Sequence, residues 1–68
     1  MASLDTELLK AARKACGLSQ QTLADMIGIE QQSYQRIEAG KRDPSVPLLV
    51  RLCDVLDVSA DALLGRRV

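Results

Sequence analysis

Apolar residues recur every three or four positions along most of the chain, and short polar segments interrupt the repeat. This period is typical of amphipathic helices, and no segment shows the alternation that predicts a strand. The first helix is expected over residues 6–16, just before Gly17, because glycine often follows the last residue of a helix. Arg13 lies at the edge of its apolar face. The residues expected on that face are Leu8, Leu9, Ala12, Ala15 and Cys16.

Two more helices are expected on either side of a short turn that contains glycine. Ser19 is a favourable N-cap for a helix over residues 20–27, and Gly28 follows its end. Only residues 28–30 separate it from the next predicted helix, over residues 31–39. A glycine-containing turn of this length between two helices is the spacing of a helix-turn-helix. The residues expected to face inward are Leu23, Met26 and Ile27 in one helix and Tyr34 and Ile37 in the other.

The last third of the chain predicts two further helices. Ser45 can cap a helix that has Pro47 in its first turn, where the missing N–H costs little. Ser59 can cap a short final helix that contains Leu63 and Leu64. A wide apolar stripe on the longer helix predicts that it is the central buried element. This stripe consists of Leu48, Leu49, Leu52, Val55 and Leu56.

The chain is short and its charges balance. Sixty-eight residues leave room for one small domain, so we predict a single all-α, compact five-helix domain over residues 1–68. Its packed part is expected at about 6–64, with a short basic tail at 65–68. Nine Lys and Arg balance nine Asp and Glu, which gives a net charge of +0. The bulk charge therefore indicates neither a nucleic-acid binder nor a binder of acidic ligands, and any such role depends on where the charges lie.

Residue types that most metal sites and many enzymes need are absent or scarce. The chain has no His and two Cys, too few ligands for a structural zinc site, and it lacks the commonest general base. We therefore expect no metal, no cofactor and no enzymatic activity. Cys16 and Cys53 are expected to be small buried residues of a reduced cytosolic protein, without a disulfide. No apolar run approaches the roughly 20 residues of a membrane span, and residues 1–10 lack a signal-peptide core, so we expect a soluble cytoplasmic protein.

The predicted helix over residues 31–39 has a face of long hydrogen-bonding side chains. Gln32, Gln35 and Arg36 project away from the apolar pair, and Gln31 lies beside them. Glutamine can pair with the edge of adenine and arginine with the edge of guanine, so this face is suited to reading bases in the major groove. An ordinary solvated helix surface is the other interpretation. The candidate phosphate contacts on its two sides are Ser19, Gln20, Lys41 and Arg42.

These motifs, in this order, resemble the Cro/cI-type helix-turn-helix family of phage repressors and bacterial regulators. The resemblance is carried by GLSQQTLADMIG at 17–28 and QQSYQRIEAGKRDPS at 31–45, and it extends from about Leu8 to Leu64. It implies five packed helices with the third in the major groove. Arg13 and Glu38 correspond to a structural ion pair between the first and third helices. The implied DNA contacts are Gln31, Gln32 and Arg36 to base edges, Ser33 to a thymine methyl, Gln20 to phosphate, and Lys41 and Arg42 to the backbone.

Two acidic residues depart from the family pattern. Glu30 stands where most relatives carry Ser or Thr before the third helix, and Asp43 adds negative charge to a turn that is often wholly basic. An acid at either position should repel a nearby phosphate. We therefore expect weak nonspecific DNA binding, or a DNA role that is tuned by a partner.

The resemblance predicts a sequence-specific, non-enzymatic transcriptional regulator that acts as a repressor and binds double-stranded DNA as a homodimer on a near-palindromic site. The candidate interface residues are Val58, Leu63, Leu64 and Val68, although Leu63 or Leu64 could instead complete the core. The alternative is a protein-interaction module, such as an antitoxin-like partner, for which DNA binding is secondary. The net charge of +0 and Glu30 both allow this alternative.

Overall fold

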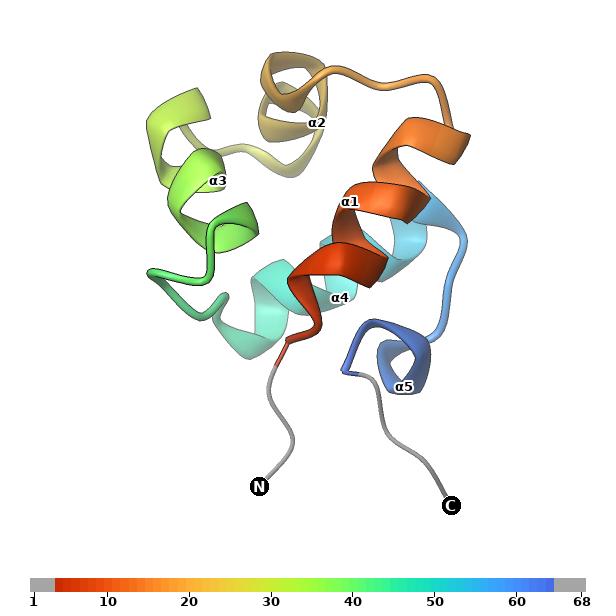
Figure 1. Ribbon diagram of the computed structural model, residues 1–68. Helices are drawn as coiled ribbons and strands as arrows, with labels where there is room; N and C mark the ends of the chain where they lie inside the picture. Colours follow the sequence, from red (N-terminus) through yellow and green to blue (C-terminus); the bar gives the residue numbers. More distant parts are fainter. Residues whose placement is uncertain (1–3, 65–68) are drawn as a thin grey trace.

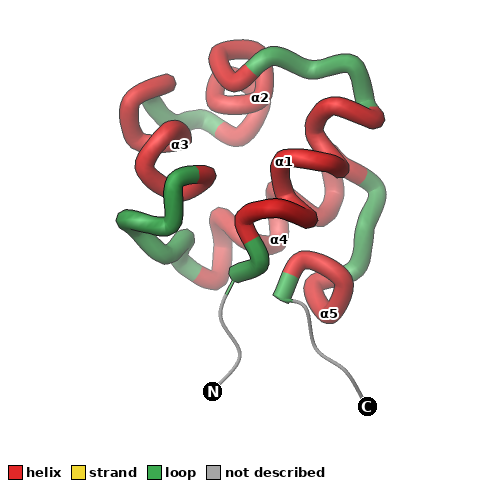
Figure 2. The backbone as a smooth tube through the Cα atoms, in the orientation of Figure 1, coloured by secondary structure: helices red, strands yellow, loops and turns green. Residues whose placement is uncertain are grey.

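The computed structural model describes residues 4–64, which form five short helices and no strand (Figures 1 and 2). The helices are α1 (Thr6–Ala15), α2 (Gln20–Ile27), α3 (Gln31–Glu38), α4 (Val46–Leu56) and α5 (Ala60–Leu63). The predicted all-α class and the order of elements are confirmed. The predicted ends of the first and third helices are each one residue too long, because Cys16 and Ala39 are C-caps. Residues 65–68, with the predicted basic tail, lie outside the described residues.

Side chains cap the N-termini of four described helices. The capping oxygens belong to Asp5 for α1, Ser19 for α2, Ser45 for α4 and Ser59 for α5. The predicted caps Ser19, Ser45 and Ser59 are thus confirmed. Glu30 is the N-cap of α3, but its side chain makes no capping hydrogen bond. These caps satisfy N–H groups that have no partner within the helix and set the point at which each helix begins.

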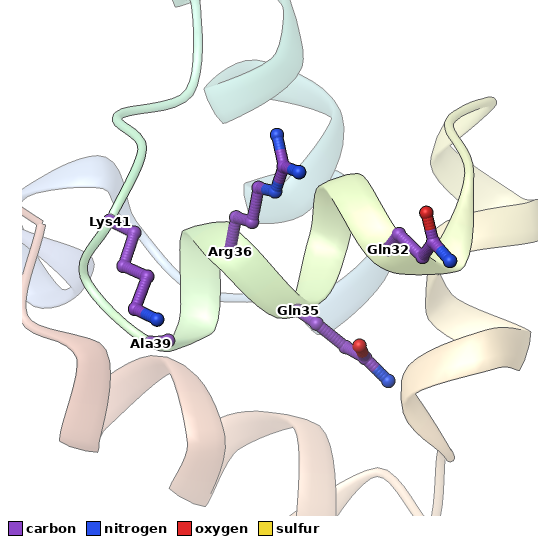
Figure 3. A pocket seen from close by; sticks show the side chains of 5 residues that line it. All are labelled: Gln32, Gln35, Arg36, Ala39 and Lys41. Carbon is purple, nitrogen blue, oxygen red and sulfur yellow. The ribbon is translucent and has the colours of Figure 1, made fainter.

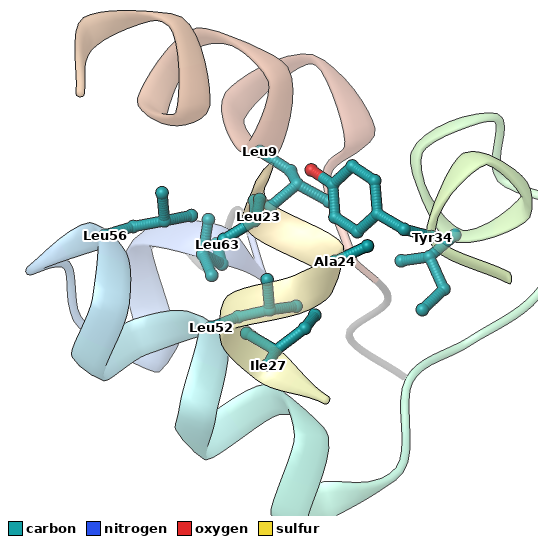
Figure 4. Packing of buried hydrophobic residues seen from close by; sticks show 9 residues of the cluster. Leu9, Leu23, Ala24, Ile27, Tyr34, Leu52, Leu56 and Leu63 are labelled. Atoms are coloured by element: carbon teal, nitrogen blue, oxygen red, sulfur yellow. The ribbon is translucent and has the colours of Figure 1, made fainter. Parts of the chain in front are cut away.

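All five described helices contribute side chains to one core, which Figure 4 shows in close-up. Helices of 4 to 11 residues are too short to be stable alone, so burial of these side chains provides most of their stability. Tyr34 is the largest of the fully buried residues, and α4 runs across the core with Leu52 at its middle. The buried set is Leu9, Leu23, Ala24, Ile27, Tyr34, Ile37, Leu52, Leu56 and Leu63.

The inward face of α2 differs from the prediction at Met26. Its side chain is 54% exposed, whereas Leu23, Ala24 and Ile27 are fully buried. On a helical wheel these three residues cluster around a direction that lies about 110° from Met26, since successive residues turn by about 100°. The small Ala24 thus occupies a position in the core that the apolar period alone assigned to Met26.

The inward face of α1 is rotated relative to the prediction, toward a charged residue. Arg13 is buried beside Leu9, whereas Leu8 and Ala15 are exposed. Cys16 is also exposed, so the expectation that it is buried was wrong; it lies past the last turn of α1 at the C-cap. The apolar pattern predicted the wrong rotation because Arg13 has a partner on α3 that permits its burial.

The turn between α2 and α3 is held by a residue of α4. Gly28 has a φ of +80°, a left-handed conformation that favours glycine, and it ends α2. Nη1 of Arg51 donates a hydrogen bond to the backbone oxygen of Ile27, at 3.2 Å. The carbonyl of Ile27, which has no partner within α2, therefore accepts a hydrogen bond from a side chain of α4 that lies 24 residues later in the sequence.

Replacement of Gly28 by Ala is expected to cost more stability than replacement of Gly17 by Ala. Both glycines are left-handed, with φ of +80° and +72°, so each variant should lose about 1 to 2 kcal/mol. A Cβ at Gly28 would lie 3.2 Å from Nη1 of Arg51, whereas nothing lies within 4 Å of a Cβ at Gly17. Displacement of Arg51 from Ile27 should add about 1 kcal/mol in Gly28→Ala. Urea unfolding of both variants measures the difference, and equal losses would show that the Arg51 contact contributes nothing.

Candidate nucleic-acid interface

The position of α3 in the fold determines which of its side chains reach solvent. Tyr34, Ile37 and Glu38 are buried against the other helices. The predicted base-reading residues Gln31, Gln32, Gln35 and Arg36 are all exposed, and Ser33 is half-buried. The structure therefore brings the long polar side chains together on one solvent-facing surface. A contact of Ser33 with a thymine methyl stays a prediction.

A shallow groove follows this exposed surface of α3 (Figure 3). It is lined by Gln32, Gln35, Arg36, Ala39 and Lys41. The chain turns back after α3, and the N–H of Lys41 donates to the oxygen of Arg36 at 2.9 Å, so Lys41 lies at the end of the groove. In Figure 3, Gln35 points to the opposite side of α3 from Arg36. The polar side chains of α3 thus divide between two sides of its exposed surface.

The two predicted phosphate contacts at the start of α2, the N-cap Ser19 and Gln20, already have partners within the protein. Oγ of Ser19 accepts from the N–H of Thr22 and donates to Oγ1 of Thr22, at 3.0 and 2.9 Å. Nε2 of Gln20 donates to Oε1 of Glu38 at 3.2 Å. Gln20 keeps a second amide hydrogen for a phosphate, whereas the hydroxyl hydrogen of Ser19 is in use. Lys41 and Arg42 are exposed in the turn after α3, as the prediction requires.

A buried ion pair joins α1 to α3, and it is the pair that the resemblance implied. Nε and Nη2 of Arg13 donate to Oε2 and Oε1 of Glu38 at 2.9 and 3.0 Å, a two-pronged geometry. Nη1 of Arg13 also donates to the oxygen of Leu18 at 2.7 Å. With the bond from Gln20, one carboxylate connects α1, α2 and α3. This cluster holds the exposed surface of α3 at a set angle to the rest of the domain.

The charge of Glu38 is compensated inside the protein. Burial raises the pKa of Glu38, but the hydrogen bonds that its carboxylate accepts, first among them those from Arg13, lower the pKa by more. The carboxylate therefore stays charged and paired at neutral pH. The hydrogen bond to Glu38 raises the pKa of Arg13, and burial raises the pKa of Tyr34. Since the charge of Glu38 is paired, the acids that remain exposed at the two ends of α3 are Glu30, before the helix, and Asp43, in the turn after it.

The proposed interface residues at the end of the chain do not all remain available. Leu63 is buried, so of the two roles that the sequence left open for it, completion of the core is the one that the structure shows, and Leu63 is not an interface candidate. Val58 and Leu64 are half-buried and retain accessible surface. Val68 lies outside the described residues.

The described residues offer neither a metal site nor a membrane span. Over residues 4–64, no group of three or more His, Cys, Asp or Glu side chains is placed to hold a metal ion. None of the helices in this range is long and apolar enough to cross a membrane. Cys53 is half-buried, and both thiols are free.

The fold and the polar surface together define the class of protein. Two helices joined by residues 28–30 precede α4, and the second of them exposes Gln and Arg side chains next to the turn that holds Lys41 and Arg42. This arrangement is that of a helix-turn-helix domain.

Comparison with known proteins gives the family. A helix-turn-helix family model matches residues 9–63, and the chain belongs to this family. The SPbeta prophage-derived uncharacterized HTH-type transcriptional regulator YonR of Bacillus subtilis is 45% identical over 58 residues, which are 85% of this chain and 54% of that protein. The cryptic phage CTXphi transcriptional repressor RstR of Vibrio cholerae is 42% identical over 60 residues, 88% of this chain and 54% of that protein. The chain thus spans about half the length of these curated relatives.

Solved structures agree with this assignment. The P22 c2 repressor, in its crystal structure with synthetic operator 9T, superimposes with a TM-score of 0.82 at 28% identity, covering 90% of this chain and 92% of that chain. The resemblance to phage repressors that the motifs indicated is therefore confirmed at the level of both sequence and fold.

Proposed function

We propose that this chain binds double-stranded DNA as the sequence-specific domain of a transcriptional repressor, with α3 in the major groove. The observation that carries the proposal is the exposed surface of α3, whose Gln and Arg side chains lie opposite the buried Tyr34, Ile37 and Glu38. Two findings about similar proteins support it: RstR is a transcriptional repressor by name, and the P22 c2 repressor was solved with an operator. A role on DNA also fits the cytoplasmic location expected from the sequence.

The local charges make the proposal compatible with a net charge of +0. Glu38 is neutralised by Arg13, which leaves the cations Arg36, Lys41 and Arg42 against the acids Glu30 and Asp43 near α3. This small surplus favours phosphate binding only weakly. Nonspecific affinity should be low, and base contacts should provide much of the affinity for the cognate site.

A homodimer on a near-palindromic site is the arrangement we propose for the complex. Two copies of α3 would then enter major grooves about one helical turn, roughly 34 Å, apart. Val58 and Leu64 remain the candidate interface residues because both keep accessible surface near the end of α4 and around α5.

Selection from a random pool of duplex DNA tests the function directly. The wild-type chain is expected to enrich a two-fold symmetric sequence, and the logarithm of its binding constant for that site should fall linearly with the logarithm of the salt concentration. Lys41→Gln should weaken binding to all sequences. It should also make the slope of log binding constant against log salt concentration less steep, by about the amount that one phosphate contact contributes. Lys14→Gln on α1 removes the same charge away from the groove and should leave the slope unchanged. If no sequence is enriched and binding of the chain to duplex DNA does not depend on salt, the proposal is contradicted. That result would favour the protein-interaction alternative.

A further inference from the structure

The outer side of α4 carries an apolar face that the rest of the described domain leaves largely uncovered. Val46, Leu49, Val50 and Cys53 lie within an arc of about 100° on this helix, since successive residues turn by about 100°. Val46 is 74% exposed and Val50 is 54% exposed. Leu49 and Cys53 pack against the core with one side and keep accessible surface on the other. We call these four residues the α4 face.

The α4 face makes this helix apolar around most of its circumference. Only two of its 11 residues, Arg51 and Asp54, are charged, and the guanidinium of Arg51 donates to the carbonyl of Ile27. A helix that is apolar on nearly every side is usually buried on every side, and an apolar patch exposed on a small domain marks a contact with another molecule. The α4 face is therefore an interaction surface, and its partner must present a matching apolar strip.

The charges at the two ends of the α4 face identify the partner. Lys41 and Arg42, against Asp43, leave a net positive charge in the turn before α4, whereas Asp54 and Asp57 make its last turn and C-cap negative. The dipole of α4 has the same polarity, positive at the N-terminus and negative at the C-terminus. A strip that is apolar in the middle and opposite in charge at each end is what a second copy of α4 presents when it runs in the reverse direction.

We infer that the α4 face joins two copies of this chain, with their α4 helices antiparallel across a two-fold axis. Such an axis makes each contact occur twice, and an axis perpendicular to α4 reverses the direction of the helix in the partner. With the axis at the middle of the face, between Leu49 and Val50, Val46 faces Cys53 of the partner subunit. The inference rests on the homodimer of the proposed function and identifies the surface through which it forms.

Disulfide cross-linking of the full chain tests this register. Cys16→Ser first removes the exposed thiol, so that Cys53 is the only cysteine left. Oxidation by copper phenanthroline of the chain with Cys16→Ser and Val46→Cys should give a covalent dimer, because position 46 faces Cys53 of the partner subunit. Adding Cys53→Ser should abolish that dimer. Cys16→Ser alone should give none, since the two copies of Cys53 would lie about 10 Å apart along the helices, too far for a disulfide.

Sedimentation equilibrium of the chain without DNA measures the same contact as a dissociation constant. Val46→Asp places an acid near the negative end of the partner's α4, and should raise the dissociation constant of the dimer by roughly 30-fold or more. Val46→Lys should raise it less, because the new charge is opposite to the charges that it meets. Leu8→Asp is the matched control: Leu8 is also an exposed apolar residue in the first turn of a helix, and its replacement should leave the dissociation constant unchanged.

The outcomes separate the inference from the function on which it rests. If the wild-type chain stays monomeric at the highest concentrations measured, or if it dimerises but Val46→Asp changes nothing, the inference is overturned; the second result would favour a contact through Val58 and Leu64. A covalent dimer of Cys16→Ser alone would overturn the antiparallel register. Selection from the random DNA pool measures DNA binding separately, so DNA binding can stand when the α4 contact fails. Thermal unfolding at concentrations where the chain is monomeric provides the folding control, because Val46 and Leu8 are exposed.

Discussion

Replacing Glu38 by Gln is expected to lower the free energy of unfolding by about 3 kcal/mol, which is a large fraction of the stability of so small a domain. Glu38 is 5% exposed and its partner Arg13 is 9% exposed. The variant would leave the guanidinium of Arg13 buried without a counter-ion, because the arginine cannot lose its proton in this pH range. Urea unfolding followed by circular dichroism measures the loss.

Two controls distinguish a buried charge pair from a general effect of the substitution. Glu7→Gln makes the same chemical change in the exposed pair of Glu7 with Lys10, where the charged atoms are 4.0 Å apart, and should not measurably change stability. Replacing both buried partners, as Arg13→Met with Glu38→Leu, should recover much of the lost stability, since no unpaired charge remains. If the double variant is no more stable than Glu38→Gln, the loss does not arise from the unpaired charge.

The pH dependence of the difference in unfolding free energy between wild type and Glu38→Gln provides a second measurement. The net effect of burial and of the bonds from Arg13 is to lower the pKa of Glu38 from its ordinary value of 4.5. A carboxyl with a lowered pKa stabilises the fold above its unfolded pKa, and this contribution is lost as the pH falls through the folded pKa. The difference between wild type and Glu38→Gln should therefore be full at neutral pH and shrink below about pH 4.5. A difference that is constant across the acid range would contradict this account of Glu38.

Replacing Leu52 by Ala is expected to lower the free energy of unfolding by about 2 to 5 kcal/mol. Leu52 is fully buried at the middle of α4, and α4 packs against both α2 and α5. Loss of its side chain would leave a cavity that short helices, held in place by their neighbours, can fill only in part. Val50→Ala on the same helix is the matched control, because Val50 is 54% exposed and should lose little on truncation. Equal losses in the two variants would show that α4 is not the central element of the core.

Most of the fold could be predicted because its signals are local. The apolar period, the caps Ser19, Ser45 and Ser59, and the glycine turn after α2 each depend on residues within about four positions of one another. The polar surface of α3 was also predictable, since Tyr34 and Ile37 identify its buried side. That Gln31, Gln32, Gln35 and Arg36 read bases stays a prediction until a DNA site is known.

The rotation of a helix about its own axis was less predictable. In α1 and α2 the apolar residues cover a wide arc, so the period permits several rotations, and the neighbouring helices select one. Burial of Ala24 instead of Met26 and of Arg13 instead of Leu8 depends on what α3 and α4 place opposite them. Leu63 was ambiguous for the same reason, because a leucine at the end of a short helix is equally suited to a core and to an interface.

The sequence by itself determined five helices, the caps of three of them, a helix-turn-helix and the polar character of the exposed α3 surface, because these follow from chain-local geometry and from side-chain chemistry. Only the tertiary structure decided how that surface is held. The bonds of Gln20 and Arg13 to Glu38, and of Arg51 to Ile27, join residues 18, 25 and 24 positions apart. Such contacts exist only after the helices have packed, since it is packing that excludes water and brings together side chains that no local spacing relates.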